Sequence, residues 1–323
     1  MTFNNYPFIS IETDLIKLNI NLQKMIVAKH PVLYAAAQHL FNAGGKRLRP
    51  SIIFILSKHT TDNNTIFSEH RRLAEITEII HTASLVHDDV IDDCETRRGI
   101  NTVHNMFNTK IAILAGDFLF AQSSWYLANL NNLSVVKTIS KVITDFAEGE
   151  VRQGLTNFDT TISIDDYIEK SFYKTASLIA SSCQGTAMLS NCKKNIISNF
   201  YLYGKHIGLA FQIIDDILDI TSSSNTLGKP AGSDCKNGNL TAPLMFALIK
   251  YPQLITLIDQ EFQNVNDMNI IINTIKNTNA IEKSKDLARE HIQIAIDIIY
   301  NDDIKDTTND LLMISEYIIN RIH

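Results

Sequence analysis

The sequence has 323 residues, of which 45% are hydrophobic and 20% charged, so it is long enough to bury a large core. The formal net charge of −6 argues against a nucleic-acid-binding surface, so any affinity for anions must come from local basic clusters. The N-terminus lacks the pattern of a secretory signal, and no apolar run looks long enough to cross a bilayer, which predicts a cytosolic protein.

Apolar residues recur at three- and four-residue spacing along most of the chain, which predicts helices. One such stripe consists of Leu73, Ile76, Ile80, Ala83 and Val86. Prolines and glycines are few and stand mostly at expected helix ends, and no run of alternating strands is present. We therefore expect an all-α fold in a single domain over residues 1–323. It would have an N-terminal helical segment (about 1–30), a motif-bearing core (about 31–250) and C-terminal helices (about 251–323).

The stretch GGKRLRP, Gly44 to Pro50, combines basic residues with the start of a helix. Lys46, Arg47 and Arg49 follow a flexible Gly-Gly turn, and a proline suits the first turn of a helix. A helix N-terminus with cationic side chains is an anion-binding site. The stretch therefore predicts a phosphate site.

The stretch HDDVIDDCETRRG, residues 87–99, places acidic side chains near the end of a predicted helix. Asp88 and Asp92 lie one turn apart with Asp89 beside them, so their carboxylates can share cations. The helix macrodipole disfavours negative charge at this end, and oxygen ligands suit Mg²⁺. The alternative is a solvated acidic face.

The same spacing recurs in FQIIDDILD, residues 211–219, as Asp215, Asp216 and Asp219. These acids interrupt an apolar helical pattern, where unpaired carboxylates would be costly. Two helices that each carry such a cluster can hold several Mg²⁺ ions in the core of a bundle. Acidic clusters for Mg²⁺ together with basic clusters for phosphate predict a diphosphate site, although each lysine taken alone could be a solvated surface charge.

With these motifs in order from Gly44 to about Leu248, the sequence resembles the trans-type isoprenyl diphosphate synthases, or polyprenyl synthetases. The motifs are GGKRLRP, EIIHTASLVHDDVIDDCETRRG, AGDFLF, EGEVRQG, KTASLIA, GLAFQIIDDILD and GKPAGSD. The resemblance implies a helical bundle of the isoprenoid synthase type with a central cavity, usually a homodimer. It also implies condensation of an allylic diphosphate with isopentenyl diphosphate, dependent on several Mg²⁺ ions, with Mn²⁺ as a possible substitute. A peripheral membrane contact for product release is a further expectation.

The resemblance also implies a role for each matching residue. The Mg²⁺ ligands would be Asp88, Asp89, Asp92, Asp215, Asp216 and Asp219. Isopentenyl diphosphate would be held by Lys46, Arg49, His81 and Arg98. The allylic diphosphate would be held by Arg97, Lys174, Thr175, Gln212 and Lys229. The catalytic set would be Asp88, Asp92, Arg97, Lys174, Asp215 and Lys229. For His81 the alternative is a satisfied core histidine.

One position departs from the family's pattern. After GKPxG the family usually reads D-x-x-x-G-K, whereas this chain has Asp234, Gly238 and then Asn239. A lysine that would touch the allylic diphosphate is therefore missing. Lys236 is a candidate to compensate for it, and Asn239→Lys is expected to tighten the allylic diphosphate.

The implied mechanism is driven by charge and needs no nucleophilic side chain. Cations stabilise the diphosphate as its C–O bond breaks, and the double bond of isopentenyl diphosphate attacks the allylic cation that remains. A proton is then lost, most simply to the released diphosphate. The protein supplies positioning and a dry cavity.

Small side chains before the first acidic cluster predict a long product. Ala83 and Ser84 stand where short-chain members of the family place aromatic rings, which implies an open tunnel and octaprenyl diphosphate or a product within one or two isoprene units of it. Close helix packing is the alternative explanation of their size. The floor of the tunnel would be set by candidates among Phe118, Leu119, Phe120 and Trp125. Such a product would supply the side chain of a respiratory quinone such as ubiquinone.

Three other functions remain open at this point. A shorter-chain synthase (C15–C20) would share all these motifs. A terpene cyclase or a head-to-head synthase would not need GGKRLRP, and a non-catalytic partner subunit tends to lack intact aspartate clusters.

Overall fold

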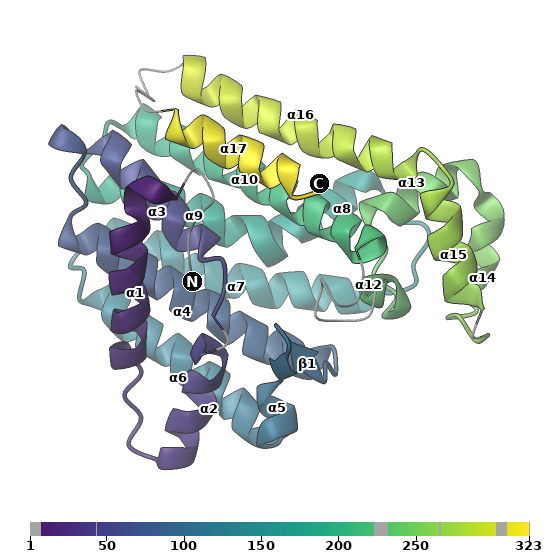
Figure 1. Ribbon diagram of the computed structural model, residues 1–323, viewed down its shortest axis with the longest axis horizontal. Helices are drawn as coiled ribbons and strands as arrows, with labels where there is room; N and C mark the ends of the chain where they lie inside the picture. Colours follow the sequence, from purple (N-terminus) through teal and green to yellow (C-terminus); the bar gives the residue numbers. More distant parts are fainter. Residues whose placement is uncertain (1–7, 43, 223–231, 265, 302–308, 323) are drawn as a thin grey trace. The chain divides into compact units, whose positions relative to one another are not determined.

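The computed structural model describes residues 8–42, 44–222, 232–264, 266–301 and 309–322, and these are almost entirely α-helical, as predicted (Figure 1). The longer helices are α1 (Glu12–Met25), α2 (Pro31–Asn42), α3 (Leu48–Thr60), α4 (Ser68–Ile91), α6 (Thr109–Ala128), α7 (Leu133–Leu155), α8 (Ile164–Ser171), α9 (Ser177–Leu189), α10 (Lys194–Thr221), α13 (Ala242–Lys250), α15 (Asp267–Lys276), α16 (Ala280–Asn301) and α17 (Asp310–Ile319). The shorter elements are α5 (Val103–Met106), α12 (Ser233–Lys236), α14 (Ile255–Asp259), the strands β1 (Thr96–Arg97) and β2 (Ile100–Asn101), and the helical turns η1 (Ile9–Ile11), η2 (Asp62–Asn64), η3 (Phe172–Ala176), η4 (Pro252–Leu254) and η5 (Asn320–Ile322).

Contacts between residues group the chain into two compact units. Unit 1 consists of Met1–Ile143, Leu178–Gly204 and Ile298–Ile314, and unit 2 of Thr144–Ser177, Lys205–Asp297 and Ser315–His323. The single domain expected from the sequence stays a prediction.

Unit 1 is organised around α4, which packs against α1, α3 and α6. The predicted apolar stripe of α4 is buried: Leu73, Ile76, Ile80, Ala83 and Val86 are at most 1% exposed. Burying this stripe removes apolar surface from water and stabilises the unit. Periodicity therefore located both the helix and the face that it buries.

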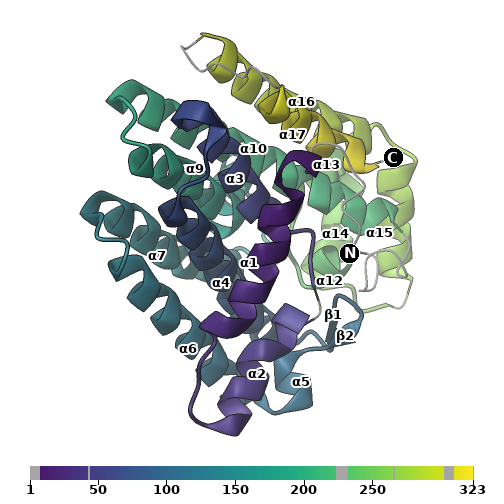
Figure 2. The same cartoon turned by 60° about the vertical axis from the view of Figure 1, so that its left-hand side comes forward.

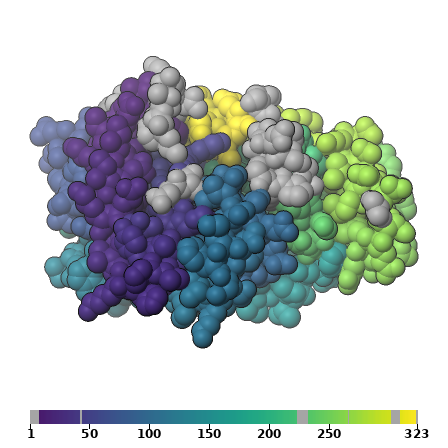
Figure 3. Space-filling model, turned by 60° about the horizontal axis from the view of Figure 1, so that its bottom comes forward, coloured from purple at the N-terminus to yellow at the C-terminus, as the bar shows by residue number. Residues whose placement is uncertain are grey.

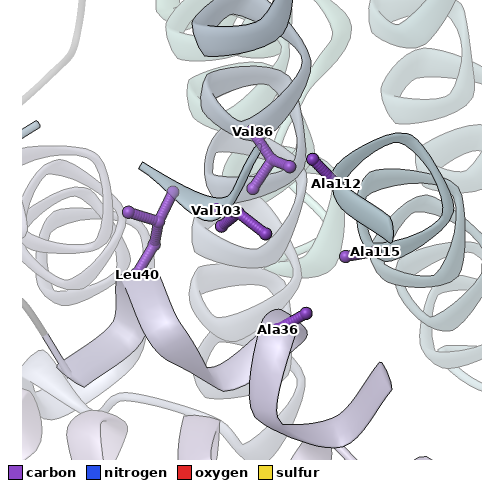
Figure 4. Packing of buried hydrophobic residues seen from close by; sticks show 6 residues of the cluster. All are labelled: Ala36, Leu40, Val86, Val103, Ala112 and Ala115. Atoms are coloured by element: carbon purple, nitrogen blue, oxygen red, sulfur yellow. The ribbon is translucent and has the colours of Figure 1, made fainter. Parts of the chain in front are cut away.

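Small residues let α4 and α6 approach closely. Figure 4 shows Val86 of α4 facing Ala112 and Ala115 of α6, next to Val103 of α5 and to α2. At Gly116 of α6 an added Cβ would lie 2.2 Å from Nε2 of His87, so any other residue there would displace the His87 ring. His87 is in turn held by the carbonyl oxygen of Ile113, at 3.0 Å from its Nε2.

A short β-hairpin follows α4, although the sequence predicted no strands. Thr96 pairs with Asn101 and Arg97 with Ile100, and the two residues between the strands, Arg98 and Gly99, have φ of 54° and 77°. Positive φ at both positions is typical of a type I′ turn. Two-residue strands are too short to show alternation, so the pattern could not reveal them. Figure 2 shows β1 and β2 beside α5, and in Figure 3 the blue surface of this part of the chain lies next to the purple surface of the N-terminal helices.

Unit 2 contains α8, η3 and α12–α15, with α13 packed against α8 and α15. The start of α8 is fixed by Ser163, whose Oγ accepts from the N–H of Asp166, while Asp166 accepts from the N–H of Ser163. After α8 the chain passes through one π-helical turn, Phe172–Ala176, in the KTAS motif. Such π-turns are rare and frequently occur at functional sites.

Among the described residues, α6 alone has the length and apolar composition of a membrane span, contrary to the sequence-based expectation that no run does. A third of its most apolar window is buried in the protein. Helices in the core of a globular protein satisfy the same criteria, so a single such helix is weak evidence for a span.

Candidate active site

The first acidic cluster lies at the C-terminal end of α4, in unit 1. Asp88 and Asp89 belong to the last turn, and the N–H of Asp92 closes it by donating to the carbonyl oxygen of Asp88 at 2.8 Å. Asp89 is only 1% exposed, and its Oδ1 accepts from Nε of Arg97 at 2.5 Å. Burial raises the pKa of Asp89, and the neighbouring Arg97 guanidinium opposes this shift. The structure thus brings together two predicted residues, Asp89 and Arg97, as an ion pair.

The chemistry of this cluster fits a hard divalent cation. Its donors are all carboxylate oxygens, and Oδ2 of Asp89 is buried with no hydrogen-bond partner among the described residues. A buried carboxylate oxygen without a hydrogen-bond partner is stabilised by a nearby cation. In the described part of the chain no three His, Cys, Asp or Glu side chains form a ready-made group of metal ligands.

In GGKRLRP, one of the three basic residues points into the core. Arg47 forms a buried ion pair with Glu78, both side chains being 4% exposed, and its Nε donates to Oδ1 of Asn19 at 2.9 Å. Arg47 is therefore directed into the core, unlike the place in the phosphate site that GGKRLRP alone suggested for it. Lys46 is exposed, and Pro50 lies in the first turn of α3, as expected.

Three residues predicted to hold isopentenyl diphosphate lie together in unit 1. Nη1 of Arg49 is 3.1 Å from Nε2 of His81, and Arg98 donates from Nη1 to the carbonyl oxygen of Gly44. The guanidinium of Arg98 lies so close to Gly45 that an added Cβ there would be 2.9 Å from Nη1. The Gly-Gly turn thus makes room for this arginine.

His81 is surrounded by positive charge. Burial lowers its pKa well below the usual value, and Arg49, Arg98, Arg97 and Arg47 lower it further, in that order. A neutral imidazole can accept a hydrogen bond from Arg49 at Nε2. Because Arg47 is paired with Glu78 and Arg97 with Asp89, Arg49 and Arg98 are the arginines beside the neutral His81 that suit an anion.

The second acidic cluster, on α10 in unit 2, is held by hydrogen bonds. Both oxygens of Asp216 accept, one from the hydroxyl of Tyr167 at 2.6 Å and one from Nε2 of Gln212 at 2.7 Å. Burial and the nearby Asp234 raise the pKa of Asp216 to about 7, against the effect of these hydrogen bonds and of Lys170. Asp219 accepts from the hydroxyl of Ser233 at 3.2 Å.

Asp215 contacts an arginine near the C-terminus that sequence reasoning missed. Nη2 of Arg321 is 2.6 Å from Oδ1 of Asp215, and its guanidinium lies 4.3 Å from the centre of the Phe211 ring. Nε and Nη1 of Arg321 are buried without a hydrogen-bond partner among the described residues. An isolated arginine in an apolar C-terminal segment carries no motif, so no signal in the sequence pointed to it.

The KTAS motif connects to both α7 and α10 within unit 2. Nζ of Lys174 lies 2.8 Å from Oε1 of Glu150 and 3.1 Å from Oε1 of Gln153, two residues of the EGEVRQG motif. Thr175 donates to Oε1 of Gln212 at 2.6 Å. Thr175, Gln212 and Asp216 therefore form one chain of hydrogen bonds, in which Tyr167 is a member that sequence reasoning missed.

Around Asn239, the neighbouring lysine is not the one expected. Nζ of Lys170 in α8 donates to Oδ1 of Asn239 at 2.5 Å, whereas Lys236 is exposed at the end of α12. Lys229, predicted to bind the allylic diphosphate, lies outside the described residues.

The two residues predicted to leave the tunnel open lie on α4. Ala83 is fully buried, and the hydroxyl of Ser84 donates to the carbonyl oxygen of His81 at 2.9 Å. Of the candidates for the floor, Leu119 is fully buried and Trp125 is 61% exposed. An exposed ring does not line an enclosed tunnel within one chain, so Trp125 is the weakest candidate.

Known proteins similar to this chain agree with the motifs. The sequence model of the family described as Polyprenyl synthetase matches residues 30–275. A prenyl transferase of Porphyra purpurea is 60% identical over 296 residues, 92% of each chain. Solanesyl-diphosphate synthase 2, chloroplastic, of Oryza sativa is 50% identical over 289 residues, 88% of this chain and 72% of the relative.

The fold is also that of a solved structure of a prenyl diphosphate synthase. The crystal structure of heptaprenyl diphosphate synthase from Staphylococcus aureus has a TM-score of 0.90 and 32% sequence identity, and the match covers 96% of this chain and 98% of that one. The match of the family's sequence model and these relatives extend over most of the chain. The chain therefore belongs to the polyprenyl synthetase family, and it is an enzyme of the polyprenyl diphosphate synthase type.

Proposed function

We propose that this enzyme is a long-chain synthase that adds several isopentenyl diphosphates, head to tail, to an allylic diphosphate such as farnesyl diphosphate. Its product would be octaprenyl diphosphate or a chain within one or two isoprene units of it. The observation that carries the proposal is the contact of Arg49, from the GGKRLRP motif, with His81, which forms a basic group distinct from the aspartates that would hold Mg²⁺. A synthase that joins two diphosphates needs such a second anion site, whereas a terpene cyclase does not.

Mg²⁺ ions, with Mn²⁺ as a possible substitute, would be held by Asp88, Asp89 and Asp92 and by Asp215, Asp216 and Asp219. When bound, they supply positive charge that neutralises the leaving diphosphate. The chain's own cations add to this: Arg97, Lys174 and Lys229 would bind the allylic diphosphate, with Thr175 and Gln212 as hydrogen-bonding partners. Lys46, Arg49, His81 and Arg98 would hold isopentenyl diphosphate.

The reaction proceeds by heterolysis. The C–O bond of the allylic diphosphate breaks and its electron pair stays on the diphosphate, whose charge the basic side chains stabilise. The double bond of isopentenyl diphosphate then attacks the allylic cation, and a proton passes to the released diphosphate. No protein nucleophile is required, so the contribution of the chain is to bind, orient and exclude water.

The deciding experiment is to incubate the purified protein with farnesyl diphosphate, labelled isopentenyl diphosphate and Mg²⁺, and to separate the products by length. We expect long linear prenyl diphosphates. Products of fifteen or twenty carbons would instead identify a short-chain synthase, and cyclic hydrocarbons a terpene cyclase. No product from the chain alone would point to a partner subunit.

The two substrates should respond to different basic residues. Arg49→Met is expected to raise the KM for isopentenyl diphosphate about 10-fold or more, because a charged hydrogen bond is worth roughly 1.5–3 kcal/mol, and to change the KM for the allylic substrate little. Lys174→Met and Lys229→Ala should do the reverse. Steady-state kinetics with each substrate varied in turn checks both. Lys141→Met, an exposed lysine of α7, is the control. Equal changes in both KM values would contradict the assignment.

Product length should respond to Ala83. Ala83→Phe is expected to shorten the products toward farnesyl or geranylgeranyl diphosphate while condensation continues, because the ring would block the path of the growing chain. Chromatography of the labelled products measures this. Ala74→Phe, at another fully buried alanine of α4, controls for overpacking, which costs roughly 1–3 kcal/mol of stability. An active Ala83→Phe enzyme with unchanged product length would support the alternative that Ala83 is small only for packing.

The remaining predictions concern the setting of the enzyme. A homodimer is supported by the exposed apolar residues of α6, among them Ile113, Leu114 and Trp125. A product of this length suits the side chain of a quinone, and its release into a membrane suits a peripheral contact. The cytosolic location stays a prediction, since the relative from Oryza sativa is chloroplastic.

A further inference from the structure

Asn239 is where this chain lacks the lysine of the family's pattern, and a lysine from another helix lies against it. Nζ of Lys170 donates to Oδ1 of Asn239 at 2.5 Å, across 69 positions of sequence. An ammonium group thus sits within hydrogen-bonding distance of the side chain that the pattern would make a lysine. Both residues belong to unit 2, as do α8 and α12.

The surroundings of Lys170 are those of a functional cation rather than of a surface charge. Lys170 is only 8% exposed, and lysines are almost never buried unless they are paired. Burial lowers its pKa most, the charges of Asp216 and Asp234 raise it, and Lys174 lowers it again. Lys170 therefore lies near Asp216 of the second cluster, to which Tyr167 connects it, and it senses the charges of Asp234 and of Lys174, the lysine assigned to the allylic diphosphate.

The ammonium group keeps donors for a ligand. Lysine has three N–H donors, and within the described residues one of them is taken, by Asn239. Asn239 offers an acceptor oxygen, so it orients Lys170 without neutralising it. The ring of Tyr167, whose hydroxyl binds Asp216, lies 5.8 Å from Nζ and further fixes the position of this group.

We infer that Lys170 supplies the cation that the sequence lacks at position 239, and that it binds the allylic diphosphate together with Lys174. The inference rests on the proposed function, because it assumes a diphosphate substrate at the second aspartate cluster. It replaces the expectation that Lys236 compensates, since Lys236 is exposed and Lys170 is the lysine that contacts Asn239. It also reverses the expectation for Asn239→Lys, which would now place two ammonium groups side by side.

A charge relocation tests the inference. Lys170→Met is expected to raise the KM for the allylic substrate about 10- to 100-fold, with a smaller change in the KM for isopentenyl diphosphate. Asn239→Lys alone should also raise the KM for the allylic substrate, because its ammonium group and that of Lys170 repel each other. The double variant Lys170→Met/Asn239→Lys moves the charge to the position of the family's pattern and should recover to within about 3-fold of wild type, which is strong non-additivity.

The controls separate Lys170 from its rival and from misfolding. Lys236→Met and Lys276→Met, both at exposed lysines of unit 2, should leave the KM unchanged. An unchanged KM in Lys170→Met, a loss in Lys236→Met, or a double variant as weak as the worse single variant would overturn the inference. If Lys170→Met does not fold, a normal KM in Asn239→Lys overturns it as well.

A binding measurement keeps this test apart from the test of function. The probe is the unreactive analogue farnesyl thiodiphosphate with Mg²⁺, titrated into each variant by calorimetry. Failure of the wild-type protein to make prenyl products would refute the proposed function. Tight binding of the probe to the wild type with unaltered binding to Lys170→Met would refute the role of Lys170 alone.

Discussion

Replacing Asp88 or Asp215 by alanine is expected to lower turnover by at least about 10³-fold while the protein stays helical. Each change removes a carboxylate that would bind Mg²⁺ from a side chain that is partly exposed, 38% in the case of Asp215. Asp215→Ala also removes the ion pair with Arg321, so its effect on the fold is measured alongside turnover. The loss should appear mainly in kcat, because the charge on the leaving diphosphate develops only as the bond breaks. Turnover of labelled isopentenyl diphosphate and far-UV circular dichroism measure the two effects.

Asp93→Ala provides the matched control for the first cluster. Asp93 directly follows Asp92, but its side chain is fully exposed, so its removal should leave turnover unchanged. Treatment of the wild-type enzyme with EDTA should abolish activity, and added Mg²⁺ should restore it. Near-normal turnover in Asp88→Ala or Asp215→Ala, with EDTA also harmless, would rule out metal-assisted ionisation.

The helical fold could be predicted because its signal is local. The three- and four-residue spacing of apolar residues in α4 indicates directly which face is buried, and all five residues of the predicted stripe are buried. The same periodicity placed His81 two turns before Asp88. That His81 lies near Arg49, 32 positions away, was implied only by the family resemblance, which assigned both residues to isopentenyl diphosphate.

Contacts between distant segments left no signal in the sequence. A basic residue in a motif looks the same whether it points to a substrate or into the core, so the residue pattern of GGKRLRP did not separate Arg47 from Arg49, and only the family resemblance assigned Arg49 alone to a substrate. Lys170 and Arg321 belong to no recognised motif, and their contacts with Asn239 and Asp215 exist only in the folded unit. The hairpin at Arg97 was not predicted, because the residues of its turn specify it and the periodicity of apolar residues does not.

Arg47 shows how such a residue can be assigned by experiment. Arg47→Met is expected to destabilise the protein by about 3–5 kcal/mol, because it leaves Glu78 charged and buried with its partner removed. Below the unfolding transition the KM values for both substrates should stay close to those of the wild type, which separates Arg47 from Arg49. Urea unfolding followed by circular dichroism measures the stability change.

The size of the effect should depend on burial and on the charge left behind. Arg289→Met breaks an exposed ion pair with Asp286 in α16 and should cost less than about 1 kcal/mol. The double variant Arg47→Met/Glu78→Leu removes both buried charges and should be more stable than Arg47→Met alone, since no unpaired carboxylate remains. A mild effect of Arg47→Met on stability, joined to a large rise in the KM for isopentenyl diphosphate, would instead return Arg47 to the anion site that the GGKRLRP motif predicted.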